Sequence, residues 1–240
     1  MPLKGAVTVK KRYYLKTPGK IIVFVFIVIV VLTALRVIKI GAIWRLLFGG
    51  KTYTNADFGI ADYISVVDKD GDGIDDQTDI LAGARAYVAT KPKYKSVYYS
   101  GGYPDDEYGV CTDVVAQALL NAGYDLMELV NEDICAHPDD YASDCGDKNI
   151  DFRRVRNLLI YFRNTAISLT TDIEDYAEWQ GGDIVIFSGH IGIISDKRNE
   201  NGTPYMIHHG GMNGEGALRP DYEEDILELS GPVLGHFRIS

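Results

Sequence analysis

Cys111 and His190 have the side chains, and the expected positions, that covalent catalysis by a thiol requires. Cys111 begins an amphipathic segment, 111–122, that Gly123 follows, so we expect it in the first turn of a helix. Unpaired backbone N–H groups and the positive dipole end of that turn stabilise a thiolate, so the prediction is a lowered pKa for the thiol. His190 opens an apolar, strand-like segment and can act as the base that activates the nucleophile.

The next apolar segment ends in two adjacent histidines, His208 and His209. Alternation along a strand points them to opposite faces, so one of them at most can meet His190. We assign His208 as the residue that orients the imidazole. A lone histidine is more often an ordinary structural residue, which is our interpretation of His137 and His236. No C-x-x-C or H-x-x-x-H spacing supports a zinc site in place of a nucleophile.

A second set of residues, with metal-binding chemistry, lies in the acidic run 68–79. Its side-chain oxygens fall at positions 1, 3, 5, 9 and 12 of a twelve-residue loop, Gly73 stands at position 6, and a backbone carbonyl is available at position 7. A calcium loop takes its ligands from these positions, and crowded carboxylates repel one another unless a cation neutralises them. The predicted ligands of a structural Ca²⁺ are Asp68, Asp70, Asp72, Ile74, Asp76 and Asp79.

Position 12 of this loop is Asp79 and not the bidentate Glu of a signalling EF-hand. The run therefore resembles a dockerin or thrombospondin type 3 loop, for which a low affinity and extracellular calcium are expected. The alternative interpretation is a solvated acidic turn that holds no ion. For the thiol chemistry itself no cofactor is expected.

The charge is divided unevenly along the chain. Nine of the 24 Lys and Arg residues lie in the first 50 residues, which contain no acid, so the rest of the chain holds 15 basic and 34 acidic side chains and a formal charge of −19. Nucleic-acid affinity comes largely from basic side chains that contact phosphates. An acidic body of this kind indicates that nucleic acid is not a partner.

The N-terminal segment has the composition of a membrane anchor. Residues 21–35 are apolar and six basic residues precede them, so we expect a transmembrane helix over 21–43 after a cytoplasmic basic tail, 1–20. The alternative is a cleaved signal peptide, but basic and large apolar residues follow where a small-residue cleavage site should lie. The expected location is the plasma membrane, with one span, a linker at 44–54 and the soluble body on the extracytoplasmic face.

The elements that must position the candidate residues fall into two groups. Helical patterns are expected at 56–67, from Ile80, at 111–122 and at 152–164, and strand patterns at 184–187, 191–195, 205–208 and 233–239. Helices first and sheet second favour the α+β class over alternating parallel units. We divide the body into a helix, calcium loop and helix at 55–90 and a catalytic domain at 91–240.

The other two cysteines, Cys135 and Cys145, lie ten residues apart in a polar segment. In an oxidising compartment such a pair can form a disulfide that stabilises a fold by about 2 to 4 kcal/mol. Two unpaired thiols are an equally good interpretation of the spacing.

Several separated motifs resemble those of known cysteine hydrolases. YYSGGYP at 98–104, GVCTDVV at 109–115, WQGGDIVIF at 179–187, GHIGIISD at 189–196 and YMIHH at 205–209 are similar, in order and spacing, to motifs of the NlpC-type peptidase superfamily. More narrowly, GVCTDVV, NIDFRRVRNL at 149–158, GGDIV, HIGIISD and GHFR at 235–238 resemble the bacterial family catalogued as domain of unknown function 1287. This resemblance covers roughly residues 78–240.

The resemblance implies a papain-like domain in which a helix that bears Cys111 packs on an antiparallel sheet that bears His190 and His208. It implies a cysteine peptidase or amidase that hydrolyses an amide bond through a thioester, with Cys111 as nucleophile, His190 as base and His208 as the orienting residue. For an anchored enzyme outside the membrane, peptidoglycan peptides are the leading substrate. The backbone N–H of Cys111 would supply part of the oxyanion hole.

Two departures limit what the resemblance carries. Cell-wall peptidases usually have Asp-Cys-Ser-Gly at the helix start, where this chain has Val110-Cys111-Thr112-Asp113, so their substrate specificity is not implied. The narrower family often has Asn where this chain has His209. The alternatives are a catalytically inactive NlpC-like binding module and an amidase or acyltransferase acting on lipid or small-molecule amides. Three arginines at 153, 154 and 156 are expected either to clamp a substrate carboxylate or to pair with acids of the protein.

Overall fold

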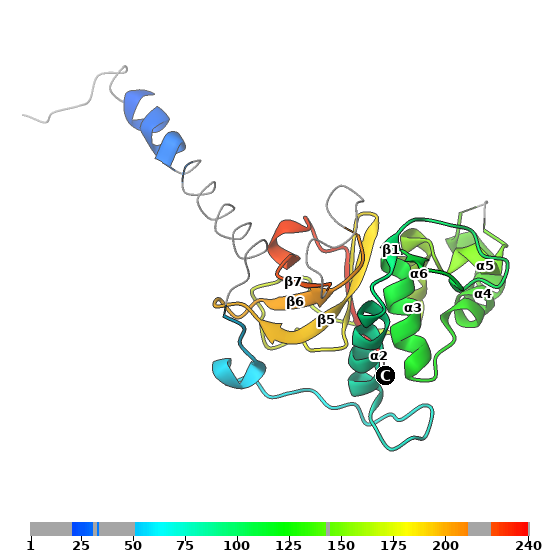
Figure 1. Cartoon of the computed structure of the whole chain (residues 1–240). Helices are drawn as coiled ribbons and strands as arrows, with labels where there is room; N and C mark the ends of the chain where they lie inside the picture. The colour runs from blue at the N-terminus through cyan, green and yellow to red at the C-terminus, as the bar shows by residue number, and fades with distance from the viewer. Residues whose placement is uncertain (1–20, 31–32, 34–50, 143–144, 211–221, 240) are drawn as a thin grey trace, which may run out of the picture. The chain divides into compact units, whose positions relative to one another are not determined.

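The computed structural model describes residues 21–30, 33, 51–142, 145–210 and 222–239 (Figure 1). The chain divides into two units, 1–41 and 42–240, and the second unit contains the sheet and its helices. In the first unit, residues 21–30 are helical. No helix within the described ranges has the length and apolar character that a membrane crossing requires. The predicted basic tail and most of the predicted anchor and linker lie outside the described residues, so they stay predictions.

A six-stranded sheet forms the centre of the second unit, with the strand order β3-β8-β4-β5-β6-β7. Every neighbouring pair in it is antiparallel. The strands are β3 (Ile167–Ser168), β4 (Ile184–Phe187), β5 (His190–Arg198), β6 (Pro204–Ile207), β7 (Glu223–Glu224) and β8 (Gly235–Arg238). A separate short parallel pair joins β1 (Lys93–Tyr94) to β2 (Tyr108–Gly109).

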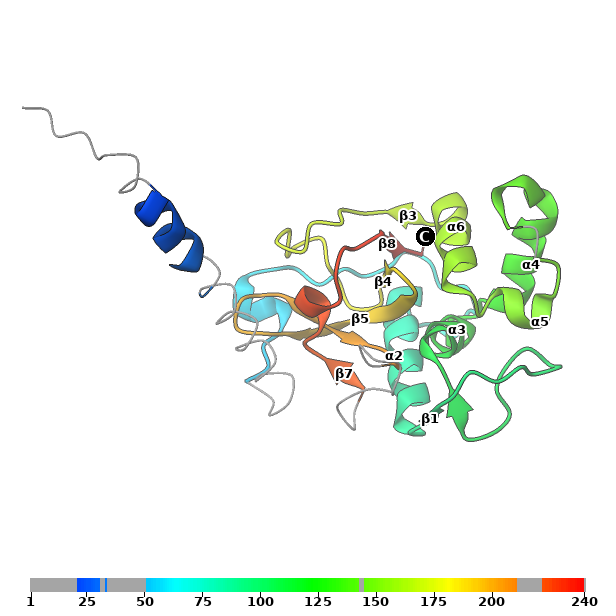
Figure 2. The same ribbon diagram turned by 90° about the horizontal axis from the view of Figure 1, so that it is seen from above.

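The helices gather beside this sheet. They are α2 (Asp76–Ala89), α3 (Cys111–Asn121), α4 (Leu126–Ala136), α5 (Lys148–Asp151) and α6 (Val155–Thr165), with single 3-10 turns η1 (Asn55–Phe58), η2 (Pro138–Asp140) and η3 (Leu227–Leu229). Two views related by a 90° turn show α2 and α3 next to the sheet and α4 and α5 farther from it (Figures 1 and 2). The predicted α+β class, with helices first and an antiparallel sheet second, is confirmed.

Strand β4 is buried on both faces of the sheet, and because side chains alternate along a strand, they enter two different cores. In β4, Ile184 and Ile186 join the large core that the sheet shares with the helices. Val185 and Phe187 join a smaller core on the opposite face, where Trp179 is fully buried. A strand buried on both faces reads as a continuous apolar run, as the IVIF of β4 does.

The predicted helix over 56–67 is wrong. The structure has only the turn η1, which ends where Gly59 adopts a left-handed φ of 67°. The chain then leaves helical conformation because its polar groups bind elsewhere: the backbone N–H of Tyr63 donates to the side chain of Gln180 at 3.2 Å, and Asn55 donates to Asp62 at 2.7 Å. Tertiary hydrogen bonds thus replace the local helical ones. The calcium-loop segment is preceded by extended chain and not by a helix.

The helix expected from Ile80 begins four residues earlier, at Asp76, because the side chain of Asp75 caps it by accepting a hydrogen bond from the Thr78 backbone. Helix α4 was not predicted, and Cys135 lies within it. All three cysteines are free, with Cys135 exposed and Cys145 partly buried. The structure therefore corresponds to the second of the two interpretations of that pair, two unpaired thiols.

Candidate active site

Cys111 is the first residue of α3, as predicted. An acid at the third position of the helix fixes this start: one carboxylate oxygen of Asp113 accepts the backbone N–H of Val110 at 2.8 Å. The same carboxylate binds both Nε and Nη2 of Arg153, at 2.7 and 2.9 Å, in a fully buried pair. A bidentate contact of this kind holds its partners in one geometry. Of the two interpretations of Arg153, pairing with an acid of the protein is the one that the structure shows.

His190 is the first residue of β5 and lines the same cavity as Cys111. This cavity, of about 330 Å³, is called the Cys111 pocket below. Among the residues that the structure describes, no Asp, Glu, Lys or Arg lines it. The other lining residues are Tyr94, Phe187, Ser188, Gly189, Gly210, Ile226, Leu229 and Ser230. The pocket therefore suits a neutral, partly apolar group more than a charged one.

A chain of three side chains leads away from the Cys111 pocket. Nε2 of His190 lies 3.0 Å from Nδ1 of His208, and the two rings meet edge to face. Nε2 of His208 lies 3.3 Å from a carboxylate oxygen of Glu224, and both of these side chains are completely buried. The structure thus places His190 in contact with His208 and in the same pocket as Cys111, and Glu224 extends the chain of side chains beyond His208.

Glu224 was missed by sequence reasoning. It lies in the two-residue strand β7, where it faces Met206 of β6. Residues 206 and 208 alternate onto the same face, so the register brings the carboxylate to His208. The only local signal is the run of three acids at 223–225, and nothing in the sequence distinguishes that run from a solvated turn.

His209 points away from this chain of residues. Its ring lies between Tyr94, at a centroid distance of 5.3 Å, and Tyr222, at 5.0 Å. Of the two adjacent histidines, His208 is the one that contacts His190. Strand alternation predicted that one of the two at most would do so, and His208 was the one that we assigned.

The pKa of Cys111 is shifted in the direction opposite to the one that its position in the helix predicted. Burial raises it to about 11. The backbone N–H of Ile191 and those of the first helical turn act in the other direction, because they stabilise the thiolate, but they do not outweigh the loss of solvent around the sulfur. A helix N-terminus lowers a thiol pKa only where water also reaches the thiol.

The pKa of His190 is lowered to about 3. Burial is the main cause, and the neighbouring imidazoles of His208 and His209 add to it because positive charges repel. At neutral pH the imidazole is therefore neutral, and so is the thiol. The resting Cys111 pocket contains a neutral thiol and a neutral base, and not a thiolate–imidazolium pair.

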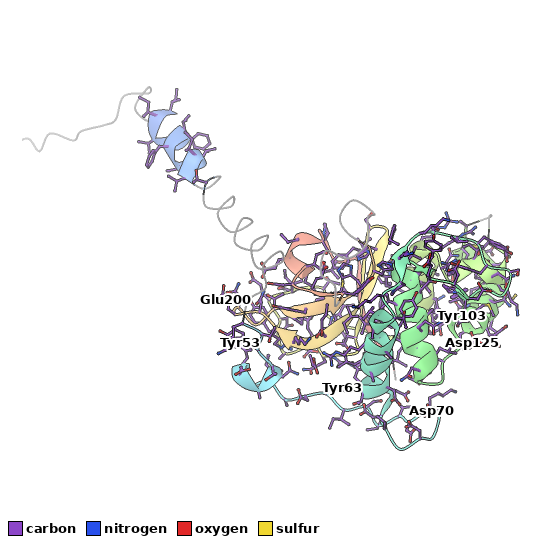
Figure 3. All side chains as sticks on the ribbon, in the orientation of Figure 1. Tyr53, Tyr63, Asp70, Tyr103, Asp125 and Glu200 are labelled. Carbon is purple, nitrogen blue, oxygen red and sulfur yellow. The ribbon has the colours of Figure 1, made fainter. Side chains whose placement is uncertain are left out.

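The predicted calcium residues form a second cluster, in the loop before α2 (Figure 3 labels Asp70). The carboxylates of Asp68, Asp70 and Asp72 lie within 4.8 Å of one another and are exposed. Asp76 is engaged elsewhere, because its carboxylate accepts the Lys69 backbone N–H at 2.7 Å and the hydroxyl of Tyr124.

The remaining two predicted ligands are Ile74 and Asp79. The backbone of Ile74 donates to the Asp72 carboxylate at 2.8 Å, so position 7 lies against the cluster. Asp79, in the first turn of α2, is only 5 % exposed. The structure thus gathers the carboxylates of positions 1, 3 and 5 directly, and does not bring that of position 9 to them.

Comparison with known proteins places most of the second unit in one family. Residues 81–239 match the family described as "Domain of unknown function (DUF1287)". The chain is also 34% identical over 172 residues to the "Uncharacterized protein YijF" of Escherichia coli (strain K12), which covers 66% of this chain and 80% of that protein. No solved structure matches. The matched region includes Cys111, His190, His208 and Glu224, and it begins after the aspartate loop.

Proposed function

The chain belongs to the family described as domain of unknown function (DUF1287), and from the pocket within that family region we propose that it is a cysteine hydrolase acting on an amide bond. The observation that carries the proposal is the hydrogen-bonded chain Glu224–His208–His190, which ends in the pocket that Cys111 also lines. A buried acid, two imidazoles and a thiol in this order form the nucleophile, base and orienting group of a covalent hydrolase.

The mechanism that we propose uses one arrangement of protons. In it, Nε2 of His208 donates to the carboxylate of Glu224, and Nδ1 of His208 accepts the Nε2–H of His190. Nδ1 of His190 is left without a proton. This is the state in which His190 can remove the proton of an attacking thiol.

The reaction follows from this arrangement. The sulfur of Cys111 attacks the carbonyl carbon of an amide while Nδ1 of His190 takes the thiol proton, because a neutral thiol cannot supply a thiolate in advance. The C–N bond then breaks and the proton passes to the leaving amine. Water hydrolyses the thioester with His190 again as base, which releases a carboxylic acid and restores the thiol. The buried carboxylate of Glu224 favours the imidazolium that forms in both steps.

The finer identity of the enzyme rests on the sequence motifs. Their resemblance to NlpC-type peptidases supports a papain-like fold and an amide of cell-wall peptides as the substrate. The apolar segment that begins at residue 21 supports an anchored enzyme whose acidic body lies outside the plasma membrane. The described lining of the pocket, which has no charged side chain, fits the neutral backbone of a peptide.

Digestion of purified peptidoglycan tests the proposal. The full-length chain, kept in detergent because of its apolar N-terminal segment, is incubated with sacculi, and the soluble fragments are analysed by mass spectrometry. Wild type is expected to release fragments with one new amine and one new carboxyl group per cut, and Cys111→Ala none. Cys135→Ala is the matched control, because that thiol is exposed and lies outside the pocket. Equal fragment release by Cys111→Ala would overturn the assignment of the nucleophile.

A binding module is the second candidate, and the neutral resting state favours it. A thiol whose pKa is raised to about 11 and an imidazole whose pKa is lowered to about 3 are not activated before a ligand arrives. A binding module would sediment with sacculi as wild type and as Cys111→Ala alike, without producing fragments. A hydrolase would cleave and, in trapping experiments, carry an acyl mass on the peptide that contains Cys111.

A further inference from the structure

The short strand β7 carries Glu224, and the sheet itself does little to hold it in place. β7 has two residues and is the last strand in the described sheet, where it pairs with β6 alone (Figure 1). The carboxylate of Glu224 lies 3.3 Å from Nε2 of His208, at the outer limit of an N–H···O hydrogen bond. A shift of β7 by about 0.5 Å would break this contact. The position of β7 must therefore be set by contacts outside its own strand pairing.

Glu223 makes those contacts. Successive side chains of a strand point to opposite faces, so Glu223 points away from the face of Glu224. Its Oε1 accepts Nη2 of Arg85 at 2.8 Å and the hydroxyl of Ser195, and its Oε2 accepts Nζ of Lys197. The Glu223 side chain is only 6 % exposed. One buried carboxylate thus binds three donors from two other elements, α2 and β5.

Arg85 connects this carboxylate to the rest of the fold. Besides Glu223 it binds Asp196, with Nη1 3.2 Å from one carboxylate oxygen and Nη2 in contact with the other. This guanidinium of α2 therefore holds β5 and β7 at the same time. A planar guanidinium that binds two carboxylates has a fixed geometry, which a single ammonium group does not reproduce. Arg85 and Glu223 are not among the described residues that line the Cys111 pocket, so they can act on a reaction there only through other residues.

We propose that Glu223 is a positioning residue for the candidate hydrolase. Held by Arg85, it fixes β7 so that Glu224 stays in contact with His208. The inference rests on the proposed function, because Glu224 acts in that mechanism by favouring the imidazolium. The effect of Glu223 on turnover passes entirely through Glu224, so the loss that follows from displacing β7 cannot exceed the loss of about 10-fold that removing the charge of Glu224 should cause.

Nuclear magnetic resonance of the imidazole nitrogens tests this positioning without reference to activity. The full-length chain in detergent is labelled with nitrogen-15 histidine, which gives signals for 5 rings. Glu223→Gln keeps the shape of the side chain and removes its charge. We expect the His208 ring signals to move toward those of Glu224→Gln, while the signals of His236, a buried ring outside the pocket, stay unchanged. His208 signals identical to those of wild type would overturn the proposal.

Two arginine variants keep the test decisive if Glu223→Gln does not fold. Arg85→Gln removes the cation and should move the His208 signals in the same direction. Arg85→Lys keeps a charged donor for Glu223, although not the bidentate geometry, so it should restore most of the wild-type signals. Equal shifts in the two arginine variants would overturn the role of the charge on Glu223. Glu128→Gln is the matched control, because it breaks an exposed ion pair with Lys148 and should leave the His208 ring unchanged.

Kinetics test whether Glu223 acts through Glu224. In the release of fragments from sacculi, Glu223→Gln should lower kcat by about 3- to 10-fold and leave KM within about twofold, since Glu223 does not line the pocket. Glu223→Gln combined with Glu224→Gln should be no slower than Glu224→Gln alone, because the first change then has no charged contact left to displace. Losses that multiply would overturn the proposal. A wild type that releases no fragments, while its His208 signals still respond to Glu223→Gln, would instead overturn the proposed hydrolase and support the positioning of β7 by Glu223.

Discussion

The Cys111 pocket and the aspartate loop both contain several ionisable groups, and they differ in the charge that those groups carry. In the pocket, burial holds the thiol and the imidazole neutral, with one carboxylate, Glu224, at the far end of the chain of residues. In the loop, the three exposed carboxylates of Asp68, Asp70 and Asp72 lie within 4.8 Å of one another. The protein alone sets the protonation state of the pocket. For the loop we predict that a calcium ion from the solution neutralises the charge.

Because of this difference, we expect changes in the two regions to affect different measurements. Changes in the pocket should alter reaction rates and proton equilibria whether or not calcium is present. Changes in the loop should alter stability and only in the presence of the ion. A loss of turnover on the order of 1000-fold therefore points to the pocket, and a change in stability that requires the ion points to the loop.

The largest expected effect is the loss of turnover in the pocket. Cys111→Ala and His190→Ala should each lower kcat/KM by about 10³-fold or more, and the double variant should be little worse because the two act as one unit. His208→Ala should lose about 10- to 100-fold, since it orients the imidazole. Glu224→Gln, which keeps the shape and loses the charge, should lose about 10-fold. Rates of fragment release from sacculi measure the series.

His137→Ala serves as the control for the histidine variants, because that ring is half exposed and pairs with Asp133 outside the pocket. If His208→Ala and Glu224→Gln keep full activity, the three-residue chain has no part in catalysis. If His190→Ala also keeps full activity, His190 is not the base.

The second effect is slow alkylation of Cys111. With a pKa of about 11, roughly one thiol in 1000 is a thiolate at pH 8, so iodoacetamide should label Cys111 about 100-fold more slowly than a free cysteine. The exposed Cys135 gives an internal comparison within the same molecule. Peptide mapping of labelled sites over time measures both rates. Faster labelling of Cys111 than of Cys135 at pH 7 would show that the helix terminus prevails over burial.

The third effect is a loss of stability in acid that comes from His190. Its pKa is lowered from 6.5 to about 3 on folding, so between these values the unfolded chain binds a proton that the folded chain does not. Stability contributed by the neutral imidazole is present above pH 6.5 and is lost as the pH falls toward 3. Near pH 4.5 the loss is about 3 kcal/mol. Urea unfolding at pH 6.5 and at pH 4.5, in chelator, measures this loss of stability. We expect it to be smaller for His190→Gln than for wild type or His137→Gln.

The sequence predicted where Cys111 and His190 lie because each residue begins a strongly patterned element. Cys111 begins an amphipathic helix and His190 begins an apolar strand, so periodicity fixed their positions before any contact was known. Alternation also separated His208 from His209. Glu224 was missed because β7 is two residues long, and such a strand exists only through pairing with β6.

The electrostatics and the irregular segments could not be predicted from local sequence. The pKa of Cys111 depends on burial beneath the sheet, which the helix position does not reveal. The helix expected over 56–67 failed because distant groups, among them Gln180, bind that backbone. In the loop, the spacing of the aspartates was informative, yet the engagement of Asp76 by Tyr124 depends on a residue 48 positions away.

The smallest expected effect is that of calcium on turnover, and it tests whether the two regions are independent. An ion that binds only the folded chain adds about 1 to 3 kcal/mol of stability. A domain of ordinary stability, about 5 to 15 kcal/mol, is already more than 99.9 % folded at 25 °C, so this addition does not change the amount of active protein. Wild-type kcat in chelator and in about 10 mM Ca²⁺ should therefore agree within about twofold at 25 °C. The two values should diverge only as the temperature approaches the melting range in chelator. A tenfold change at 25 °C that Asp70→Asn with Asp72→Asn removes would show that the loop controls the position of α3, and that the regions are coupled.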